Sequence, residues 1–334
     1  MSGYDVIVVG GGHAGVEAAL AAARLGCSVG LITIDSHSIA RMSCNPAIGG
    51  LAKGHLVREI DALGGFMGVA ADSTGIQFKM LNKSKGRAVW SPRAQIDKRA
   101  YEAFVQKHLT SIRNIDILQS EVKGVLLTRQ NVSGVVLSSG ETLSCRSLVL
   151  TCGTFLNGLI HVGARKIHAG RMGEEASDGI TESLVSLGLR SGRLKTGTPP
   201  RLNRETINWS AMKKIYGDHD PRPFSFSTQT FSPPNEPCHI VNTHPLVHEL
   251  ILNNLHLSPI YCGEIKGVGP RYCPSIEDKV VRFPDKASHH IFLEPEWSGS
   301  NQIYTNGFST SLPEAVQLAA LQLIPGFEKV SFFR

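Results

Sequence analysis

A glycine-rich turn near the N-terminus constrains the fold of this 334-residue chain more than any other feature. The apolar, β-branched run Tyr4–Val9 predicts a strand buried on both faces. Gly10–Gly15 follows with the sequence Gly-Gly-Gly-His-Ala-Gly, and the Ala-rich stretch Val16–Leu25 predicts a helix. Gly26 ends that helix, and Ser28–Ile34 predicts a second strand. Because the glycines stand between a strand and a helix, the unit predicts a dinucleotide-binding fold.

Each glycine of this turn has a physical task. Gly10 permits the tight turn, Gly12 lets the backbone approach a pyrophosphate, and Gly15 lets the helix pack closely on the sheet. The N-terminus of the helix offers N–H groups and a partial positive charge to the phosphates. Cofactor contacts are therefore expected from Gly10, Gly11, Gly12, His13, Ala14 and Gly15. For the ribose hydroxyl, both Thr33 and Asp35 are candidates.

A later segment favours FAD over NAD as the tightly held cofactor. Ser147–Phe155 predicts a buried strand ending in Thr-Cys-Gly-Thr, which resembles the second flavin motif of glutathione-reductase-like flavoproteins. Three short strands are predicted before it, at Glu121–Thr128, Val132–Leu137 and Glu141–Cys145. We therefore expect an α/β protein with a glutathione-reductase-like FAD-binding Rossmann fold and a β-meander inserted at about 115–147.

The composition is that of an ordinary globular protein with two basic stretches. Hydrophobic residues make up 42% of the chain and charged residues 19%, and no apolar run is long enough to span a membrane. The net charge is +6, and Asp97 is the only acid between Lys79 and Arg99. A second basic stretch runs from Arg190 to Arg204. Such runs are most often solvated surface, but beside a dinucleotide motif they also suit a polyanionic ligand, nucleic acid or dinucleotide.

The seven cysteines are an odd number without framework spacing, which indicates reduced thiols and a cytoplasmic location. Cys27, Cys145, Cys152 and Cys262 fit small buried hydrophobic side chains. No metal site is expected, because the usual zinc spacings do not occur around the Cys238–His248 segment.

Cys44 and Cys273 differ, because each lies in a Gly/Pro-rich loop with polar neighbours. Cys273 is expected at a helix N-cap with Pro274 as the first helical residue, where the helix N-terminus and Arg271 favour thiolate. The helix predicted after Cys44 has an apolar face formed by Leu56, Val57, Ile60 and Leu63.

Six parts of the chain together resemble a single family. They are Gly10–Gly15, Ser43–Gly50, Gly75–Leu81 with Ser84–Gly86, Pro92–Gln95, Leu194–Arg201 and Gly269–Lys279. The family is that of the tRNA uridine 5-carboxymethylaminomethyl modification enzymes, also called glucose-inhibited division protein A. The resemblance runs over all 334 residues, and Ser-Cys-Asn-Pro-Ala-Ile-Gly-Gly is far more specific than the glycine turn.

The resemblance implies an activity. The family binds FAD, reduces it with NADH and takes a one-carbon unit from methylenetetrahydrofolate. With a GTPase partner it attaches an aminomethyl or carboxymethylaminomethyl group to carbon 5 of the wobble uridine of tRNA. Cys44 and Cys273 match the family's two catalytic cysteines: one would add to carbon 6 of the uracil and the other would handle a proton. Which cysteine has which role is left open.

The resemblance also implies further contacts and partners. FAD contacts transfer to Val122 and Ser177, and Gly269–Phe283, with Gly269 and Arg271, matches the family's nicotinamide-nucleotide region. The basic residues expected to face flavin or tRNA phosphate are Lys79, Lys83, Lys85, Arg87, Arg93, Lys195 and Arg201. A homodimer is expected, and no membrane partner.

Three domain segments are expected. Residues 1–200 form an FAD-binding domain, residues 201–268 an inserted substrate-side domain of mixed α/β structure, and residues 269–334 return to the FAD-binding domain. Ser311–Glu314 resembles a capping box that opens a final helix. The family's C-terminal helical domain is expected to be absent from this chain.

Three other functions fit parts of the sequence. The first is an FAD- and folate-dependent tRNA uridine methyltransferase of the same fold, against which Ser43–Gly50 speaks. The second is a flavin disulfide reductase, which would need a C-x-x-C or C-x-x-x-x-C pair that the chain lacks. The third is a flavin-bound scaffold that recruits the GTPase, and such a scaffold would tolerate replacement of Cys44 or Cys273.

Overall fold

The computed structural model describes residues 3–171, 173–265, 269 and 274–333. The chain divides into two compact units. Unit 1 consists of residues 1–160, 168–191 and 219–234, and unit 2 of residues 161–167, 192–218 and 235–334.

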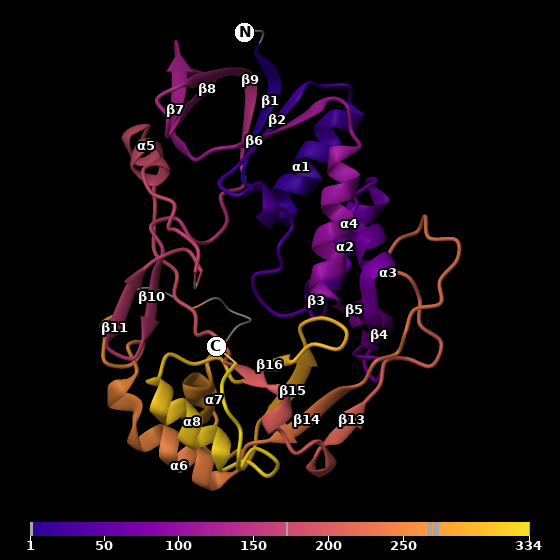
Figure 1. The fold of residues 1–334 in the computed structure, drawn as a ribbon, viewed down its shortest axis with the longest axis vertical. Coiled ribbons are helices and arrows are strands. Elements are labelled where there is room, and N and C mark those ends of the chain that lie inside the picture. The colour runs from indigo at the N-terminus through magenta and orange to yellow at the C-terminus, as the bar shows by residue number, and fades with distance from the viewer. Residues whose placement is uncertain (1–2, 172, 266–268, 270–273, 334) are drawn as a thin grey trace. The chain divides into compact units, whose positions relative to one another are not determined.

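Six strands of unit 1 form one mixed sheet. Their spatial order is β6 (Ile115–Gln119), β2 (Val29–Thr33), β1 (Tyr4–Val9), β9 (Thr142–Leu150), β8 (Asn131–Leu137) and β7 (Val122–Thr128). The first four run parallel, whereas β9, β8 and β7 run antiparallel as a meander (Figure 1). The expected α/β fold with an inserted meander is confirmed. The meander begins at Val122 rather than near 115, because β6 pairs in parallel with β2.

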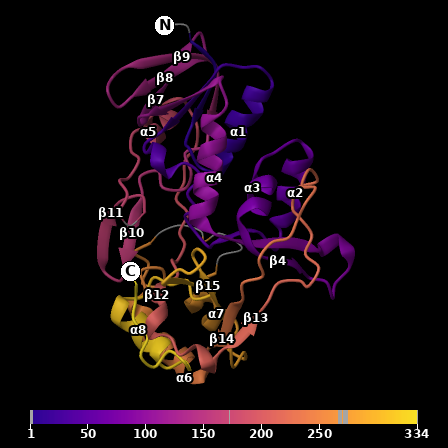
Figure 2. The ribbon, with the colours of Figure 1, turned by 45° about the vertical axis from the view of Figure 1, so that its right-hand side comes forward.

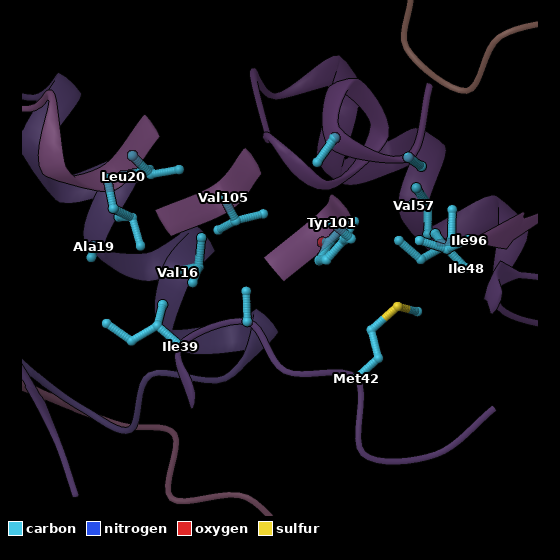
Figure 3. Close-up of a cluster of buried hydrophobic side chains, with 14 of the residues drawn as sticks. Val16, Ala19, Leu20, Ile39, Met42, Ile48, Val57, Ile96, Tyr101 and Val105 are labelled. Atoms are coloured by element: carbon cyan, nitrogen blue, oxygen red, sulfur yellow. The ribbon is translucent and has the colours of Figure 1, made fainter. Parts of the chain in front are cut away.

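Two helices of unit 1 build its main core. α1 (His13–Arg24) and α4 (Lys98–Thr110) lie side by side in Figures 1 and 2. Figure 3 shows Val16 and Leu20 of α1 close to Tyr101 and Val105 of α4, and all four are buried. Each such side chain contributes about 1.5–3 kcal/mol when it leaves water. The α4 helix begins at Lys98, directly after its N-cap Asp97, whose carboxylate accepts a 2.9 Å hydrogen bond from Ala100 N.

A second, antiparallel sheet of unit 1 has the order β3 (Ala47–Gly49), β5 (Ser91–Ile96) and β4 (Gly75–Leu81). Two helices belong to the same part of the chain, α2 (Gly54–Ala62) and α3 (Met67–Thr74), and α5 (Ile180–Ser186) packs on β7.

The predicted apolar face of α2 is largely wrong. Val57 is buried, but Leu56 is 54% and Leu63 is 89% exposed. The buried face instead contains Asp61, whose carboxylate accepts a 2.8 Å hydrogen bond from Phe226 N. A polar side chain with a backbone partner therefore occupies the interior, which hydrophobic periodicity does not detect.

Unit 2 is built on a five-stranded antiparallel sheet. Its order is β12 (Arg201–Asn203), β16 (Gln302–Asn306), β15 (His290–Pro295), β14 (Cys238–Asn242) and β13 (Lys213–Ile215). Its helices are α6 (Pro245–Asn253), α7 (Ile276–Arg282) and α8 (Glu314–Gln322). The strands β10 (Leu159–Val162) and β11 (Arg165–His168) form a separate hairpin. The described residues also include the short 3-10 helices η1 (Ser36–Ser38), η2 (Arg87–Val89), η3 (Arg204–Thr206), η4 (Trp209–Ala211) and η5 (Leu255–Leu257).

The boundaries of these units differ from the three domain segments expected from the sequence. Residues 201–268 and 269–334 share one sheet, because β15 pairs with β14 and β16 pairs with β12. The Pro-rich segment 219–234 belongs to unit 1, where Phe224 is buried in the main core. The capping box expected at Ser311 is also wrong: α8 begins at Glu314 after Pro313, and the Ser311 hydroxyl instead lies 2.8 Å from Ser258 Oγ.

Over the part of the chain that the structure describes, no helix combines the length and the apolar character that crossing a membrane requires.

Candidate functional site

Backbone oxygens crowd the glycine turn of unit 1 at Gly10 and Gly15. Gly10 has φ +108°, and a Cβ there would lie 2.4 Å from Thr151 O. A Cβ on Gly15 would lie 1.8 Å from Gly10 O. The end of β1 and the start of α1 therefore approach each other so closely that only glycine fits.

Gly12 faces the opposite situation. It is the N-cap of α1, with no side-chain cap, and a Cβ there would meet nothing within 4 Å. The first-turn N–H groups of a helix have no acceptor within the helix, and they attract an anion. A crowded turn with one open side at a helix N-terminus is the cradle that a dinucleotide pyrophosphate requires, so these residues fit FAD.

Thr151 fixes the turn from the neighbouring strand. Its Oγ1 donates to Val9 O over 2.8 Å and lies 3.1 Å from Gly10 O, and its N–H donates to Val9 O over 2.8 Å. It follows directly after β9, in the Thr-Cys-Gly-Thr segment. The sequence indicated a flavin motif there but not that this hydroxyl holds the glycine turn. This role of the Thr151 hydroxyl depends on the pairing of β9 with β1.

The two candidates for the ribose hydroxyl have different environments. Thr33 is buried at the end of β2, and its Oγ1 would lie 3.0 Å from a Cβ on Gly11. The Asp35 carboxylate caps a short 3-10 helix by accepting a 2.9 Å hydrogen bond from His37 N. Both side chains thus lie at the same end of the parallel sheet as the turn, and both remain candidates.

His13 lies in the turn and is half-buried. Its Nδ1 is buried and has no hydrogen-bond partner among the described residues. The ring packs edge-on against Tyr101 with 5.5 Å between ring centroids. Burial lowers the pKa of His13 and raises the pKa of Tyr101. A neutral His13 adds no cation to the phosphate cradle, so the helix N-terminus supplies the positive potential there.

Val122 and Ser177 meet at a shared neighbour. Val122 is buried at the start of β7, and Glu121 directly before it accepts hydrogen bonds from Ser177 Oγ at 3.3 Å and from Asp178 N at 3.0 Å. Glu121 has no signal in the sequence, because a lone carboxylate before a strand matches no motif. The structure brings the two expected FAD contacts into one corner of unit 1.

Cys44 is exposed in the loop before β3. Two hydrogen bonds hold this loop: Lys98 Nζ donates to Cys44 O over 2.7 Å, and Ile96 N donates to Pro46 O over 2.8 Å. The loop is therefore tied to β5 and α4. Cys262 is exposed as well, contrary to its expected burial, whereas burial raises the pKa values of Cys145 and Cys152.

Cys273 and Arg271 lie outside the described residues. Gly269 is exposed. The expected N-cap at Cys273 is wrong, because α7 begins at Ile276 with Ser275 as its N-cap. Ser275 Oγ accepts from Asp278 N over 3.1 Å, and the Asp278 carboxylate accepts from Ser275 N over 3.3 Å. This reciprocal pair satisfies two helix-terminal N–H groups and fixes where the helix starts.

The expected basic contacts fall in both units. In the antiparallel register of β4 and β5, Lys79 lies opposite Arg93. The loop between these strands carries the exposed side chains of Lys83, Lys85 and Arg87. In unit 2, Lys195 Nζ lies 3.5 Å from Ile260 O.

Arg201 has a largely internal environment. Its Nε forms a 3.1 Å ion pair with Glu296 Oε1, with side-chain exposures of 16% and 7%, and its guanidinium lies 4.8 Å from the Tyr304 ring centroid. The contacts of Arg201 are thus those of a packing residue within unit 2.

Comparison with known proteins identifies the family. The family model described as glucose inhibited division protein A matches residues 5–334. This chain belongs to that family. A relative from Chlorobium phaeobacteroides, named tRNA uridine 5-carboxymethylaminomethyl modification enzyme MnmG, is 54% identical over 99% of this chain and 54% of its own length. The MnmG of Thermodesulfovibrio yellowstonii is 53% identical over 99% of this chain and 53% of its own length.

A solved member of the glucose inhibited division protein A family has the same fold. The structure of Aquifex aeolicus GidA is 49% identical, with a TM-score of 0.93, and the match covers 100% of this chain and 57% of that one. The chain therefore spans about half the length of the relatives it matches. Family membership and the flavoprotein-type α/β fold expected from the sequence are both confirmed.

Proposed function

We propose that the protein is an FAD-dependent enzyme that modifies the wobble uridine of tRNA. With a GTPase partner it adds an aminomethyl or carboxymethylaminomethyl group to carbon 5, with NADH as reductant and methylenetetrahydrofolate as one-carbon donor. The proposal is carried by the exposure of Cys44 and by its loop, which is tied to α4 in the same unit as the dinucleotide cradle. The printed names of the MnmG relatives support the substrate class.

The cofactor is held by the turn and its surroundings. Gly10–Gly15 bind the pyrophosphate, Thr33 or Asp35 binds the ribose hydroxyl, and Val122 and Ser177 complete the contacts. The fit rests on the open side of Gly12 and on the close approach at Gly10 and Gly15. When bound, the flavin supplies the redox and one-carbon transfer chemistry, for which protein side chains have no equivalent.

A thiolate makes carbon 5 of the uracil nucleophilic. Its sulfur forms a bond to carbon 6, and the π electrons of the carbon 5–carbon 6 bond move to carbon 5, which attacks the one-carbon electrophile. Removal of the proton at carbon 5 then restores the double bond and expels the thiolate. Cys44 and Cys273 share these two tasks. The exposure of Cys44 suits attack on a base displaced from an anticodon loop, whose unpaired nucleotides are accessible.

The remaining expectations complete the proposal. Gly269–Phe283, including Arg271, takes the nicotinamide nucleotide of NADH. The basic residues that face flavin or tRNA phosphate are Lys79, Lys83, Lys85, Arg87, Arg93, Lys195 and Arg201. Of these, Arg201 acts mainly through its packing beside Glu296. The protein works as a homodimer in the cytoplasm.

Nucleoside mass spectrometry tests this function. tRNA is digested from a strain that lacks the gene, and from the same strain carrying the intact full-length gene. The expected result is loss of the modified wobble uridine and its return with the gene. If a 5-methyluridine is lost instead, the protein is a uridine methyltransferase. If the nucleoside profile does not change, the proposed function is wrong.

A further inference from the structure

The loop between β4 and β5 carries features that cofactor binding and the cysteine chemistry do not use. This loop, residues 82–90, has three cationic side chains, Lys83, Lys85 and Arg87, and all three are exposed. No acidic residue occurs from Lys79 to Gln95. A loop that carries cations and contains no acidic residue of its own favours an anionic partner.

The loop has a defined shape. Lys85 N donates to Asn82 O over 2.9 Å, and Asn82 Nδ2 donates to Val89 O over 3.3 Å. Arg87–Val89 form a 3-10 turn in which Val89 N donates to Gly86 O over 3.1 Å. Because these bonds lie within the loop, the backbone that carries the cations has a defined conformation before any partner binds, which reduces the entropic cost of binding.

Trp90 is the last residue of the loop, and contacts within the loop orient its indole ring. Its Nε1 donates to Lys85 O over 3.3 Å, so the polar atom of the indole is already satisfied within the protein. The Arg87 guanidinium lies 5.7 Å from the ring centroid, within cation–π range. Trp90 is half-buried, and Val89 beside it is 45% exposed. The loop thus presents an aromatic ring and a planar cation beside two lysines.

We propose that loop 82–90 binds a single-stranded segment of RNA, with a nucleobase stacked on the Trp90–Arg87 pair and the backbone phosphates beside Lys83 and Lys85. Aromatic and guanidinium planes next to a cationic track are the features that unpaired nucleotides recognise. A lipid surface fits less well, because one tryptophan and one exposed valine offer little apolar area. The inference rests on the proposed function, which supplies tRNA as the RNA.

Binding of an anticodon stem-loop RNA to the full-length, flavin-loaded protein tests this site. Trp90→Ala should weaken binding by about 5- to 150-fold without changing its salt dependence, because stacking is lost and charge is kept. Lys85→Ala should reduce the slope of log affinity against log salt by about one, because a phosphate contact is lost. Trp90→Phe should recover most of the affinity. Lys107→Ala, an exposed lysine of α4, serves as the charge control.

Several results would overturn the inference. Equal binding by Trp90→Ala and the unmutated protein would do so, provided that both retain flavin and melting temperature. The inference would also fail if Trp90→Ala weakened binding to a fully paired RNA duplex as much as binding to the stem-loop, since a duplex offers no unpaired base. Trp90-dependent binding to phosphatidylserine vesicles with unchanged RNA binding would assign the loop to a lipid surface. If the unmutated gene restores wobble modification but Trp90→Ala does not change RNA binding, the proposed function stands and this RNA site is wrong.

Discussion

Replacement by alanine is expected to have opposite effects at Gly12 and at Gly15. In Gly15→Ala the new methyl group would lie 1.8 Å from Gly10 O and 2.8 Å from Thr151 Oγ1, well below the 3.0 Å that real Cβ contacts respect. In Gly12→Ala it would meet nothing within 4 Å, and the φ of −73° is one that alanine adopts readily. The first substitution therefore acts on the fold, and the second acts on whatever approaches the turn.

The expected magnitudes follow from this geometry. Overpacking against a backbone oxygen costs about 1–3 kcal/mol. For a unit of this size each kcal/mol lowers the melting temperature by about 2–4 °C. Gly15→Ala should therefore lower the melting temperature of the apoprotein by at least a few degrees. Gly12→Ala should change the stability of the apoprotein by less than about 0.5 kcal/mol. It should nevertheless weaken FAD binding by about tenfold or more, because its methyl group fills the side from which the pyrophosphate approaches.

Thermal unfolding of the apoproteins and flavin titration of both variants measure these effects separately. Unchanged FAD affinity in a well-folded Gly12→Ala protein would show that the cofactor does not enter the cradle from its open side. An unchanged melting temperature in Gly15→Ala would refute the steric argument for the turn.

Three further predictions concern stability. Asp97→Ala removes the N-cap of α4 and should cost about 1 kcal/mol in urea unfolding, whereas Asp97→Asn should cost much less. Arg201→Ala removes the 3.1 Å ion pair to Glu296, whose side chain is only 7% exposed, so it should cost on the order of 3 kcal/mol, and an unchanged urea midpoint would contradict the buried pairing. Burial lowers the pKa of His13, so the stability of the neutral form is present above about pH 6.5 and is lost as pH falls through the lowered pKa. His13→Phe should therefore flatten the decline of the urea midpoint below pH 6.5, and an equally steep decline would contradict this account.

The sequence predicted the elements whose signals are local. The β1–α1–β2 unit and the meander are encoded by hydrophobic periodicity and by glycines at the turns, and the structure confirms them. The buried face of α2 could not be predicted, because it contains Asp61, whose carboxylate accepts a hydrogen bond from Phe226 N. Phe226 is far from Asp61 in the sequence.

The cofactor cradle was predictable only in part. The glycines of the turn follow from the motif, but Thr151 reaches Val9 O and Glu121 reaches Asp178 N only through contacts between residues distant in sequence. The start of α7 shows the same limit over a shorter range. Cys273-Pro274 has the composition of a helix start, yet Ser275 forms the capping box with Asp278, which stabilises a start two residues later. The sharing of one sheet by residues 201–268 and 269–334 depends on strand register, which composition does not encode.

The most direct test of the account uses the wobble nucleoside as its readout. A strain that lacks the gene is complemented with the full-length gene carrying Cys44→Ser, or with Cys262→Ser as the control, since Cys262 is the other exposed cysteine among the described residues. Both proteins are first checked for expression and bound flavin. We expect Cys262→Ser to restore the modified uridine in full, and Cys44→Ser to leave tRNA unmodified with its flavin retained. Full modification by Cys44→Ser would contradict the thiolate mechanism and favour a flavin-bound scaffold.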